Sequence, residues 1–187
     1  MTSRWEKAQT VLARSERLFD AIEISKAYDR MAGDITQWLR DTNPVVLCVM
    51  IGGLVPTAEL IRRFDFPFEL DYLHATRYRG DTTGADLHWK VTPSMDIAGR
   101  HVLVVDDILD EGHTLDAILE YLRHQDAAQV GSAVLVEKQH DRRDPALKAD
   151  FTGVEAEDRY LFGCGMDYLG YLRQVPGIYA VPEKFLD

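Results

Sequence analysis

The sequence HVLVVDDILDEGHTL, residues 101–115, decides the fold. It begins with a continuous run of apolar, strand-forming residues, which is typical of a strand buried on both faces of a parallel sheet. Two adjacent carboxylates, Asp106 and Asp107, stand where this strand is expected to end. A short loop with Gly112 and Thr114 follows, and a helical apolar period opens at Leu115. A strand, a loop and a helix in this order form a ligand crevice at the carboxyl end of a parallel strand.

The residues of this loop indicate which ligand the crevice suits. Backbone N–H groups at the N-terminus of a helix favour a phosphate, and Gly112 permits the close approach or positive φ that this requires. Thr114 can add a hydroxyl donor. Asp106 and Asp107 cannot bind the same phosphate, so they must serve sugar hydroxyls or a divalent cation. The stretch therefore predicts a site for a sugar phosphate.

Two other interpretations of the acidic pair compete with this one. The pair could be a metal site of the Walker B type, or simply a solvated turn. A solvated turn is disfavoured because charge placed directly after so apolar a strand is costly without a purpose. A nucleotide hydrolase of the Walker type is disfavoured because the chain lacks G-x-x-x-x-G-K-[ST].

The rest of the chain repeats the alternation of strands and helices. Residues 45–50 form a second apolar strand, and Ile51-Gly52-Gly53 leads to a helix from Pro56 to Phe64. The paired glycines suit close ligand approach, although tight helix–sheet packing would also use them. The further predicted strands are 66–75, 87–91, 130–138 and 178–181, and the other predicted helices are 3–19, 25–39 and 115–122. The pattern predicts an α/β protein with a mostly parallel sheet flanked by helices.

Residues 76–85 make a long polar connection punctuated by glycines. Loops of this length in a compact domain are usually lids or disordered tips, and two arginines and a tyrosine favour a lid. Because a strand resumes at Leu87, the whole segment is expected to be a long hairpin.

Composition limits the classes of protein to consider. A chain of 187 residues fits one domain with a real core. The net charge of -10 disfavours nucleic acid and anionic membranes as partners. Two cysteines give neither a disulfide framework nor a zinc pattern, and the first residues lack the apolar core of a signal peptide. We therefore expect a cytoplasmic protein without a membrane span.

Residues 104–114, VVDDILDEGHT, resemble the phosphoribosyl-pyrophosphate signature of type I phosphoribosyltransferases, in the form found in hypoxanthine-guanine phosphoribosyltransferases. The similarity extends from about Val45 to Val181. It implies the type I fold, with a twisted, mostly parallel central sheet flanked by helices, a small hood subdomain and a long flexible hairpin loop. The single domain, 1–187, would have its core at about 45–150, and parts of the N-terminal segment and 151–187 would form the hood.

The resemblance assigns roles to the residues of the signature. Asp106 and Asp107 would bind the ribose hydroxyls and the associated magnesium ion, with Asp167 as a further magnesium-side carboxylate. Asp110 would be the catalytic acid/base beside the imidazole nitrogen of the purine. The phosphoribosyl group would be held by Asp106, Asp107, Asp110, Glu111, Gly112, His113 and Thr114.

It also assigns residues outside the signature. Lys138 would contact the exocyclic oxygen of the purine, Tyr160 would stack on the base and the Leu161 backbone would meet its edge, with Asp167 near this group. The pyrophosphate would meet Ile51, Gly52, Gly53 and Arg173, and the lid would carry Arg77 and Tyr78.

Three residues depart from the pattern of the family. Ile51 stands where many relatives have a lysine, Arg77 replaces a common serine, and Glu111 replaces a small hydroxyl residue. The extra charge of Glu111 must point away from the phosphate or repel it. These departures leave the reaction class unchanged but affect the expected substrate affinity and base preference.

The function implied by the resemblance is purine salvage. The enzyme would make IMP or GMP and pyrophosphate from phosphoribosyl pyrophosphate and hypoxanthine or guanine, with Mg2+ as cofactor. It would act on small molecules, with neither nucleic acid nor membrane as partner, as a homodimer or homotetramer. A xanthine-preferring enzyme and a nucleotide-sensing regulator on the same fold are the alternatives. The presence of Asp110, Lys138 and Asp167 together argues against a protein that only binds.

Overall fold

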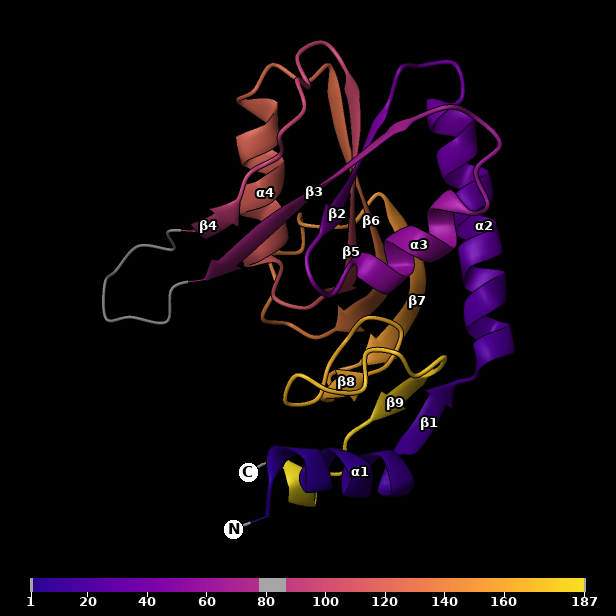
Figure 1. The fold of residues 1–187 in the computed structure, drawn as a ribbon, viewed down its shortest axis with the longest axis vertical. Helices are drawn as coiled ribbons and strands as arrows, with labels where there is room; N and C mark the ends of the chain where they lie inside the picture. Colours follow the sequence, from indigo (N-terminus) through magenta and orange to yellow (C-terminus); the bar gives the residue numbers. More distant parts are fainter. Residues whose placement is uncertain (1, 78–86, 187) are drawn as a thin grey trace.

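The computed structural model describes residues 2–77 and 87–186, and contains two sheets (Figure 1). The larger sheet has six strands in the order β4-β3-β2-β5-β6-β7. Its strands are β2 (Val45–Val49), β3 (Glu69–Arg77), β4 (Leu87–Val91), β5 (His101–Leu109), β6 (Gln129–Gln139) and β7 (Phe151–Glu157). All neighbours pair in parallel except β4, which runs antiparallel to β3. The predicted α/β class with a mostly parallel sheet is confirmed, and so is the predicted hairpin.

Helices cover both faces of this sheet (Figure 1). They are α2 (Ala21–Leu39) and α3 (Leu54–Ile61) on one face and α4 (His113–Arg123) on the other. Successive residues of β5 separate accordingly, with Leu103 packing toward α2 and α3 and Val104 toward α4. Because both faces are covered, the middle of β5 is fully buried, which is why its sequence is continuously apolar.

The smaller sheet lies beyond the carboxyl ends of the large one (Figure 1). Its strands, in the order β1-β9-β8, are β1 (Glu16–Phe19), β9 (Ile178–Ala180) and β8 (Leu161–Phe162). The helix α1 (Arg4–Arg14) and the 3-10 turn η1 (Glu183–Phe185) complete this region. Its core includes Val11 of α1 and Phe162 of β8, both fully buried.

The N-terminal boundaries differ from those predicted. The expected helix over 3–19 ends at Arg14, and residues after the extended Ser15 pair with β9 instead. The helix expected to begin after Ser25 begins five residues earlier, at Ala21. Asp20 caps it by accepting from the Ile22 and Glu23 N–H groups, and the Glu23 carboxylate accepts from the Asp20 N–H in return.

The organising stretch also differs in detail. β5 continues through the acidic pair to Leu109 because Asp106 and Ile108 still pair with β6. α4 begins at His113, so Thr114 belongs to its first turn. β7 was not predicted, because its sequence FTGVEAE has few large apolar residues.

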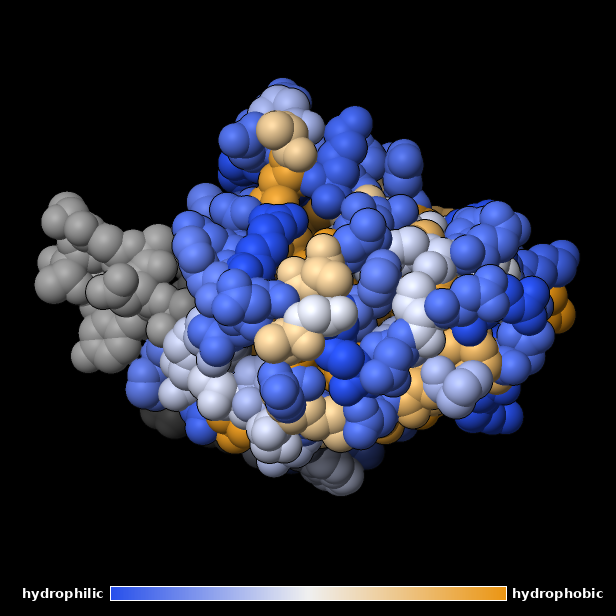
Figure 2. Space-filling view, turned by 90° about the horizontal axis from the view of Figure 1, so that it is seen from above, coloured by the Kyte–Doolittle hydropathy of each residue, from blue (hydrophilic) through white to orange (hydrophobic). Residues whose placement is uncertain are grey.

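The opposite end of the molecule, where the parallel strands begin, shows a largely hydrophilic surface with a few separate apolar side chains (Figure 2). Both cysteines, Cys48 and Cys164, are buried and unpaired, as expected. In the described part of the chain, no helix combines the length and the apolar character that crossing a bilayer requires.

The packing of α4 on the sheet can be tested with one buried residue. Ile118 lies on the buried face of α4 and is fully buried, so Ile118→Ala should lower the free energy of unfolding by about 2–5 kcal/mol through lost burial and a residual cavity. Glu120→Ala on the same helix is the control, because its side chain is 71% exposed and should matter little. Urea unfolding measures both, and equal effects would contradict the assigned helix face.

Candidate active site

A cavity of about 630 Å³ opens at the carboxyl edge of the large sheet. Its walls come from the end of β5 and the start of α4, from β6, and from the chain around β8. The predicted site residues that line it are Gly52, Asp106, Asp107, Asp110, Glu111, Gly112, His113, Thr114, Lys138, Tyr160, Leu161, Asp167 and Arg173. Segments far apart in the sequence are thus brought together at one edge of the sheet.

The acidic pair forms the closed side of this cavity. Asp107 is only 8% exposed, and the Asp107 N–H donates to Asp106 Oδ1 at 2.9 Å. Burial and the neighbouring negative charge of Asp107 raise the pKa of Asp106 well above its ordinary value. Burial likewise raises the pKa of Asp107, although the Arg173 guanidinium, whose Nη1 lies 3.8 Å from Asp107 Oδ2, opposes it. Two buried like charges of this kind would be relieved by a bound cation.

Gly52 makes room for this pair. A Cβ at residue 52 would lie 2.2 Å from Asp107 Oδ2, so any side chain there would displace the carboxylate. The same packing continues to Gly165, where an added Cβ would lie 2.2 Å from the Gly52 carbonyl oxygen. The turn after β2, the end of β5 and the loop after β8 therefore pack against one another without side chains between them.

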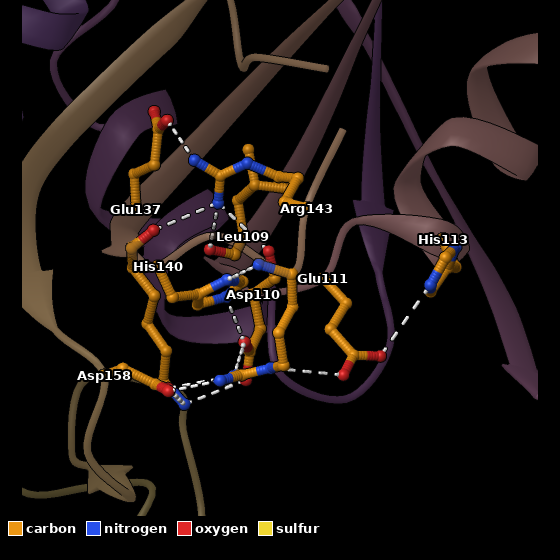
Figure 3. Close-up of polar contacts among 10 residues, drawn as sticks. Leu109, Asp110, Glu111, His113, Glu137, His140, Arg143 and Asp158 are labelled. Carbon is orange, nitrogen blue, oxygen red and sulfur yellow. Dashed lines mark hydrogen bonds and ion pairs between the residues drawn. The ribbon is translucent and has the colours of Figure 1, made fainter. Parts of the chain in front are cut away.

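The predicted phosphate loop has the backbone that an anion requires. Gly112 stands at the N-cap of α4 in the left-handed region, with φ +83°, and no side chain of the described residues caps this helix. The first N–H groups of α4 therefore remain available on the cavity side, at the positive end of the helix dipole. The Glu111 carboxylate lies to one side of these N–H groups, 3.5 Å from Arg142 Nε and 3.7 Å from His113 Nε2. Figure 3 shows Glu111 reaching toward His113.

Asp110 lies at the centre of an ion-pair network (Figure 3). Its Oδ2 accepts from Lys138 Nζ at 2.8 Å, and its Oδ1 lies 2.8 Å from His140 Nε2 and 3.4 Å from Arg142 Nη2. Burial raises the pKa of Asp110, but the hydrogen bonds from Lys138 and His140 outweigh burial and hold it below its ordinary value. Arg142 also pairs with both oxygens of Asp158, which lowers the pKa of Asp158 to about 2.

This network includes three groups that could ligate a metal. Ligand atoms of Asp110, His140 and Asp158 lie within 4.8 Å of one another. Lys138 Nζ, however, lies 2.8 Å from Asp110 and 3.6 Å from Asp158, and Arg142 contacts both carboxylates. Because these cations already neutralise the carboxylates, a metal ion would have to displace them. The acidic pair at the end of β5 is the less neutralised of the two candidate sites.

The chain after β8 supplies the remaining wall. Arg173 donates to Asp167 Oδ1 at 2.5 Å and to the Gly165 carbonyl at 2.5 Å, and Asp167 Oδ2 accepts from the Gly170 N–H. Several residues of this segment have positive φ, which explains why its sequence fits neither a plain helix nor a strand: Gly163, Cys164, Gly165, Leu169, Gly170 and Leu172. The 43% exposed Tyr160 ring stands at the mouth of the cavity.

Among the described residues, the predicted site residues Ile51 and Gly53 do not line the cavity. Ile51 is 51% exposed, and the peptide bond that precedes it is cis. Gly53 packs α3 against β5, since an added Cβ would lie 2.4 Å from the Val105 carbonyl oxygen. The predicted lid begins at the end of β3 with Arg77, and Tyr78 lies outside the described residues.

Sequence reasoning missed the contribution of the loop after β6. No site role was predicted for residues 140–148, yet His140, Arg142 and Arg143 all contact groups at the end of β5. The signal was present, because β5 and β6 are neighbours and the charged sequence QHDRRD follows β6 at the same edge.

Arg143 joins the ends of β5 and β6. Its side chain is 9% exposed and donates to Glu137 Oε1 at 2.7 Å and to the carbonyl oxygens of Asp110 and Lys138 at 3.0 and 3.1 Å. Figure 3 shows Arg143 between Glu137 and Leu109. One planar guanidinium thus fixes the backbone that carries Asp110 and Lys138.

The chain is similar in sequence to known proteins. Residues 15–169 match the model of the phosphoribosyl transferase domain. The chain is 31% identical to the hypoxanthine-guanine-xanthine phosphoribosyltransferase of Tritrichomonas foetus over 167 residues, 89% of this chain and 91% of that protein. It is 32% identical to the hypoxanthine-guanine phosphoribosyltransferase of Bacillus subtilis (strain 168) over 158 residues, 83% of this chain and 87% of that protein.

Solved structures show the same fold. A hypoxanthine phosphoribosyltransferase from Staphylococcus aureus superposes with a TM-score of 0.86 at 23% identity, over 92% of this chain and 94% of that one. A hypoxanthine-guanine-xanthine phosphoribosyltransferase superposes with a TM-score of 0.82 at 29% identity, over 90% of this chain and 97% of that one.

The bridging role of Arg143 predicts a large loss of stability on substitution. Arg143→Met should lower the free energy of unfolding by about 3–5 kcal/mol, because it leaves the 13% exposed Glu137 carboxylate without its partner. Removing both charges in Arg143→Met/Glu137→Leu should recover part of this loss. Chemical unfolding of the two single variants and the double variant measures the coupling, and additive losses would contradict the pairing.

Proposed function

The chain belongs to the phosphoribosyltransferase family, and we propose that it transfers the phosphoribosyl group of phosphoribosyl pyrophosphate to hypoxanthine or guanine, giving IMP or GMP and pyrophosphate. The proposal rests on one observation, which is that three groups of different chemical character line the same cavity. These are the buried Asp106–Asp107 pair, the open backbone at the start of α4, and the contact between Asp110 and Lys138. A sugar phosphate and an oxo-purine would use all three.

The donor would lie along the end of β5. Its ribose phosphate would accept from the N–H groups of the first turn of α4 and from the Thr114 hydroxyl. Asp106 and Asp107 would accept hydrogen bonds from the ribose hydroxyls. Arg173 would face the pyrophosphate, together with the backbone of residues 51–53, where Gly52 gives the closest approach.

The base would lie between the network and the Tyr160 ring. Lys138 Nζ would donate to the exocyclic oxygen, Tyr160 would stack on the base and the Leu161 backbone would meet its edge. Asp110, next to Lys138, would accept the proton of the imidazole nitrogen as that nitrogen attacks the ribose carbon. The pyrophosphate leaves with the electrons of the broken bond, and Arg173 stabilises its growing negative charge.

The donor set fits Mg2+ as the cofactor. Asp106, Asp107 and Asp167 offer hard carboxylate oxygens, and the buried acidic pair is short of positive charge. These residues would hold the ion, which would neutralise negative charge on the leaving pyrophosphate.

We extend the proposal to the setting of the enzyme. It would work in the cytoplasm on small-molecule substrates, apart from nucleic acid, consistent with its net charge of -10. Large apolar side chains exposed on α3 and β3, including Leu54 and Tyr72, offer surface for assembly into a homodimer or homotetramer. The small sheet with α1 would form the hood over the base, and the segment with Arg77 and Tyr78 would form the lid.

Base preference tests the proposed function. Hypoxanthine and guanine should be used with a kcat/KM at least ~100-fold above that for adenine, because an amino group leaves the buried Lys138 donor unpaired. Nucleotide formation from phosphoribosyl pyrophosphate and each base measures this, with xanthine included because the T. foetus relative is named for it. Comparable use of adenine would contradict the role of Lys138. Donor binding without turnover of any base would instead favour a nucleotide-sensing protein.

Two isosteric variants separate chemistry from donor binding. Asp110→Asn cannot accept the proton, so kcat should fall about 10²- to 10⁴-fold while the Kd of the donor changes little. Asp107→Asn should weaken donor binding about 10-fold or more in the presence of Mg2+, because charge-assisted bonds are lost. Calorimetry and steady-state kinetics measure these effects, and a near-normal kcat in Asp110→Asn would contradict the mechanism.

Asp107→Asn should also raise the melting temperature of the metal-free protein at pH 7. A carboxyl whose pKa is raised on folding stabilises the fold while it is protonated, and this contribution is lost as pH rises through the folded-state pKa. At neutral pH the acidic pair therefore opposes folding, and removing one charge relieves it.

A further inference from the structure

His140 is buried against Asp110 and has no part in the mechanism described so far. Its side chain is only 4% exposed, and its Nε2 lies 2.8 Å from Asp110 Oδ1 (Figure 3). It follows the end of β6, two residues after Lys138. Two neighbouring residues of one segment thus contact the two oxygens of one carboxylate.

The hydrogen bonds around His140 fix its tautomer. The Arg142 backbone N–H donates to His140 Nδ1 at 3.1 Å, and a ring nitrogen that accepts a hydrogen bond carries no proton. The proton of the neutral ring is therefore on Nε2, which donates it to Asp110 Oδ1. The backbone of residue 142 orients the ring, and the ring orients the carboxylate.

The two oxygens of Asp110 are consequently not equivalent. Oδ1 accepts from His140, while Oδ2 accepts from the Lys138 ammonium. When Lys138 donates to an oxo-purine, Oδ2 is the oxygen left with an open lone pair. His140 keeps the carboxylate from rotating, so Oδ2 continues to face the base.

We propose that His140 is a positioning residue, a neutral Nε2–H donor that holds the carboxylate of Asp110 with Oδ2 turned toward the purine. The inference rests on the proposed function and extends it. It assigns the proton of the purine to Oδ2 of Asp110 and names His140 as the residue that keeps this oxygen in position. It also accounts for a buried polar ring that packing alone would not require.

Other charged groups face the Asp110 carboxylate, and a test must separate their effects from that of His140. Lys138 approaches from β6, Arg142 from the loop after it, and Asp158 from the end of β7, while Glu111 contacts Arg142. Substitutions at residue 140 leave the charge of all of these unchanged. A change in the behaviour of Asp110 then reports the loss of the Nε2–H donor.

Two amide substitutions at residue 140 separate the two hydrogen bonds that His140 makes. In His140→Asn the amide oxygen can still accept from the Arg142 N–H, but the side chain is too short to reach Asp110. In His140→Gln the amide N–H extends to the position of Nε2 and can donate to Oδ1. His124→Gln is the control, because His124 is 75% exposed on α4.

His140→Asn should lower kcat about 10- to 100-fold, the size expected for a hydrogen bond to a charged group, and leave the KM of the donor within twofold. His140→Gln should recover most of the loss, and His124→Gln should match the wild type. The acid limb of the kcat profile should also move to higher pH in His140→Asn, because the ionised Asp110 loses a donor and its pKa rises. A kcat within twofold of wild type in His140→Asn, or an unmoved acid limb, would overturn the positioning role.

Nitrogen-15 NMR of the imidazole rings tests the hydrogen bond without any assay of activity. The His140 signal, assigned by its loss in His140→Gln, should show the Nε2–H tautomer in the free protein. The Nδ1–H tautomer would overturn the inference even in an active enzyme. A wild type that transfers to none of the bases would overturn the proposed function and the catalytic part of this inference, while the NMR result would still decide whether His140 donates to Asp110.

Discussion

The site depends on the fit of the Asp107 carboxylate into the space that Gly52 leaves by having no side chain. Gly165 packs on the other side of the Gly52 peptide for the same reason. Two adjacent carboxylates at the end of a buried strand are costly, and the tight packing of backbone around Asp107 leaves that residue only 8% exposed. The negative potential of the cavity is therefore built into the backbone geometry of three segments, and not into a cluster of flexible side chains.

The other half of the cavity is organised differently. Around Asp110 the charges are balanced, because Lys138 and Arg142 approach the carboxylates of Asp110 and Asp158 at short distances. Next to them, Arg143 joins the ends of β5 and β6 through hydrogen bonds to carbonyl oxygens. One half of the site thus carries unbalanced negative charge, and the other half holds paired charges in fixed positions.

The parts of the fold and of the site that could be predicted from the sequence are those in which the local residue pattern agrees with the tertiary environment. The apolar run of β5, its acidic end and Gly112 are readable because a strand covered on both faces must be apolar and a left-handed N-cap favours glycine. β7 could not be predicted, because α2 and β6 cover a strand in which only Phe151 and Val154 are large and apolar.

His140 shows a second limit of the same kind. Its importance comes from β5 and β6 lying side by side and from a backbone N–H two residues later, and neither is visible in the spacing of residues along one chain. The acidic pair could be recognised because the cost of placing charge directly after an apolar strand is visible in the local sequence. A supporting residue acquires its role only when another element packs against it.

The small sheet has a consequence for the order in which the protein can fold as it is made. β1, residues 16–19, pairs only with β9, residues 178–180, within the described chain. The edge of β1 therefore stays without its partner until the last part of the chain has been synthesised. The same strand, β9, also pairs with β8, next to the wall of the cavity that Tyr160, Asp167 and Arg173 contribute. The residues of the acidic pair and of the loop before α4 are thus synthesised well before the strand that joins the two ends of the chain in the small sheet.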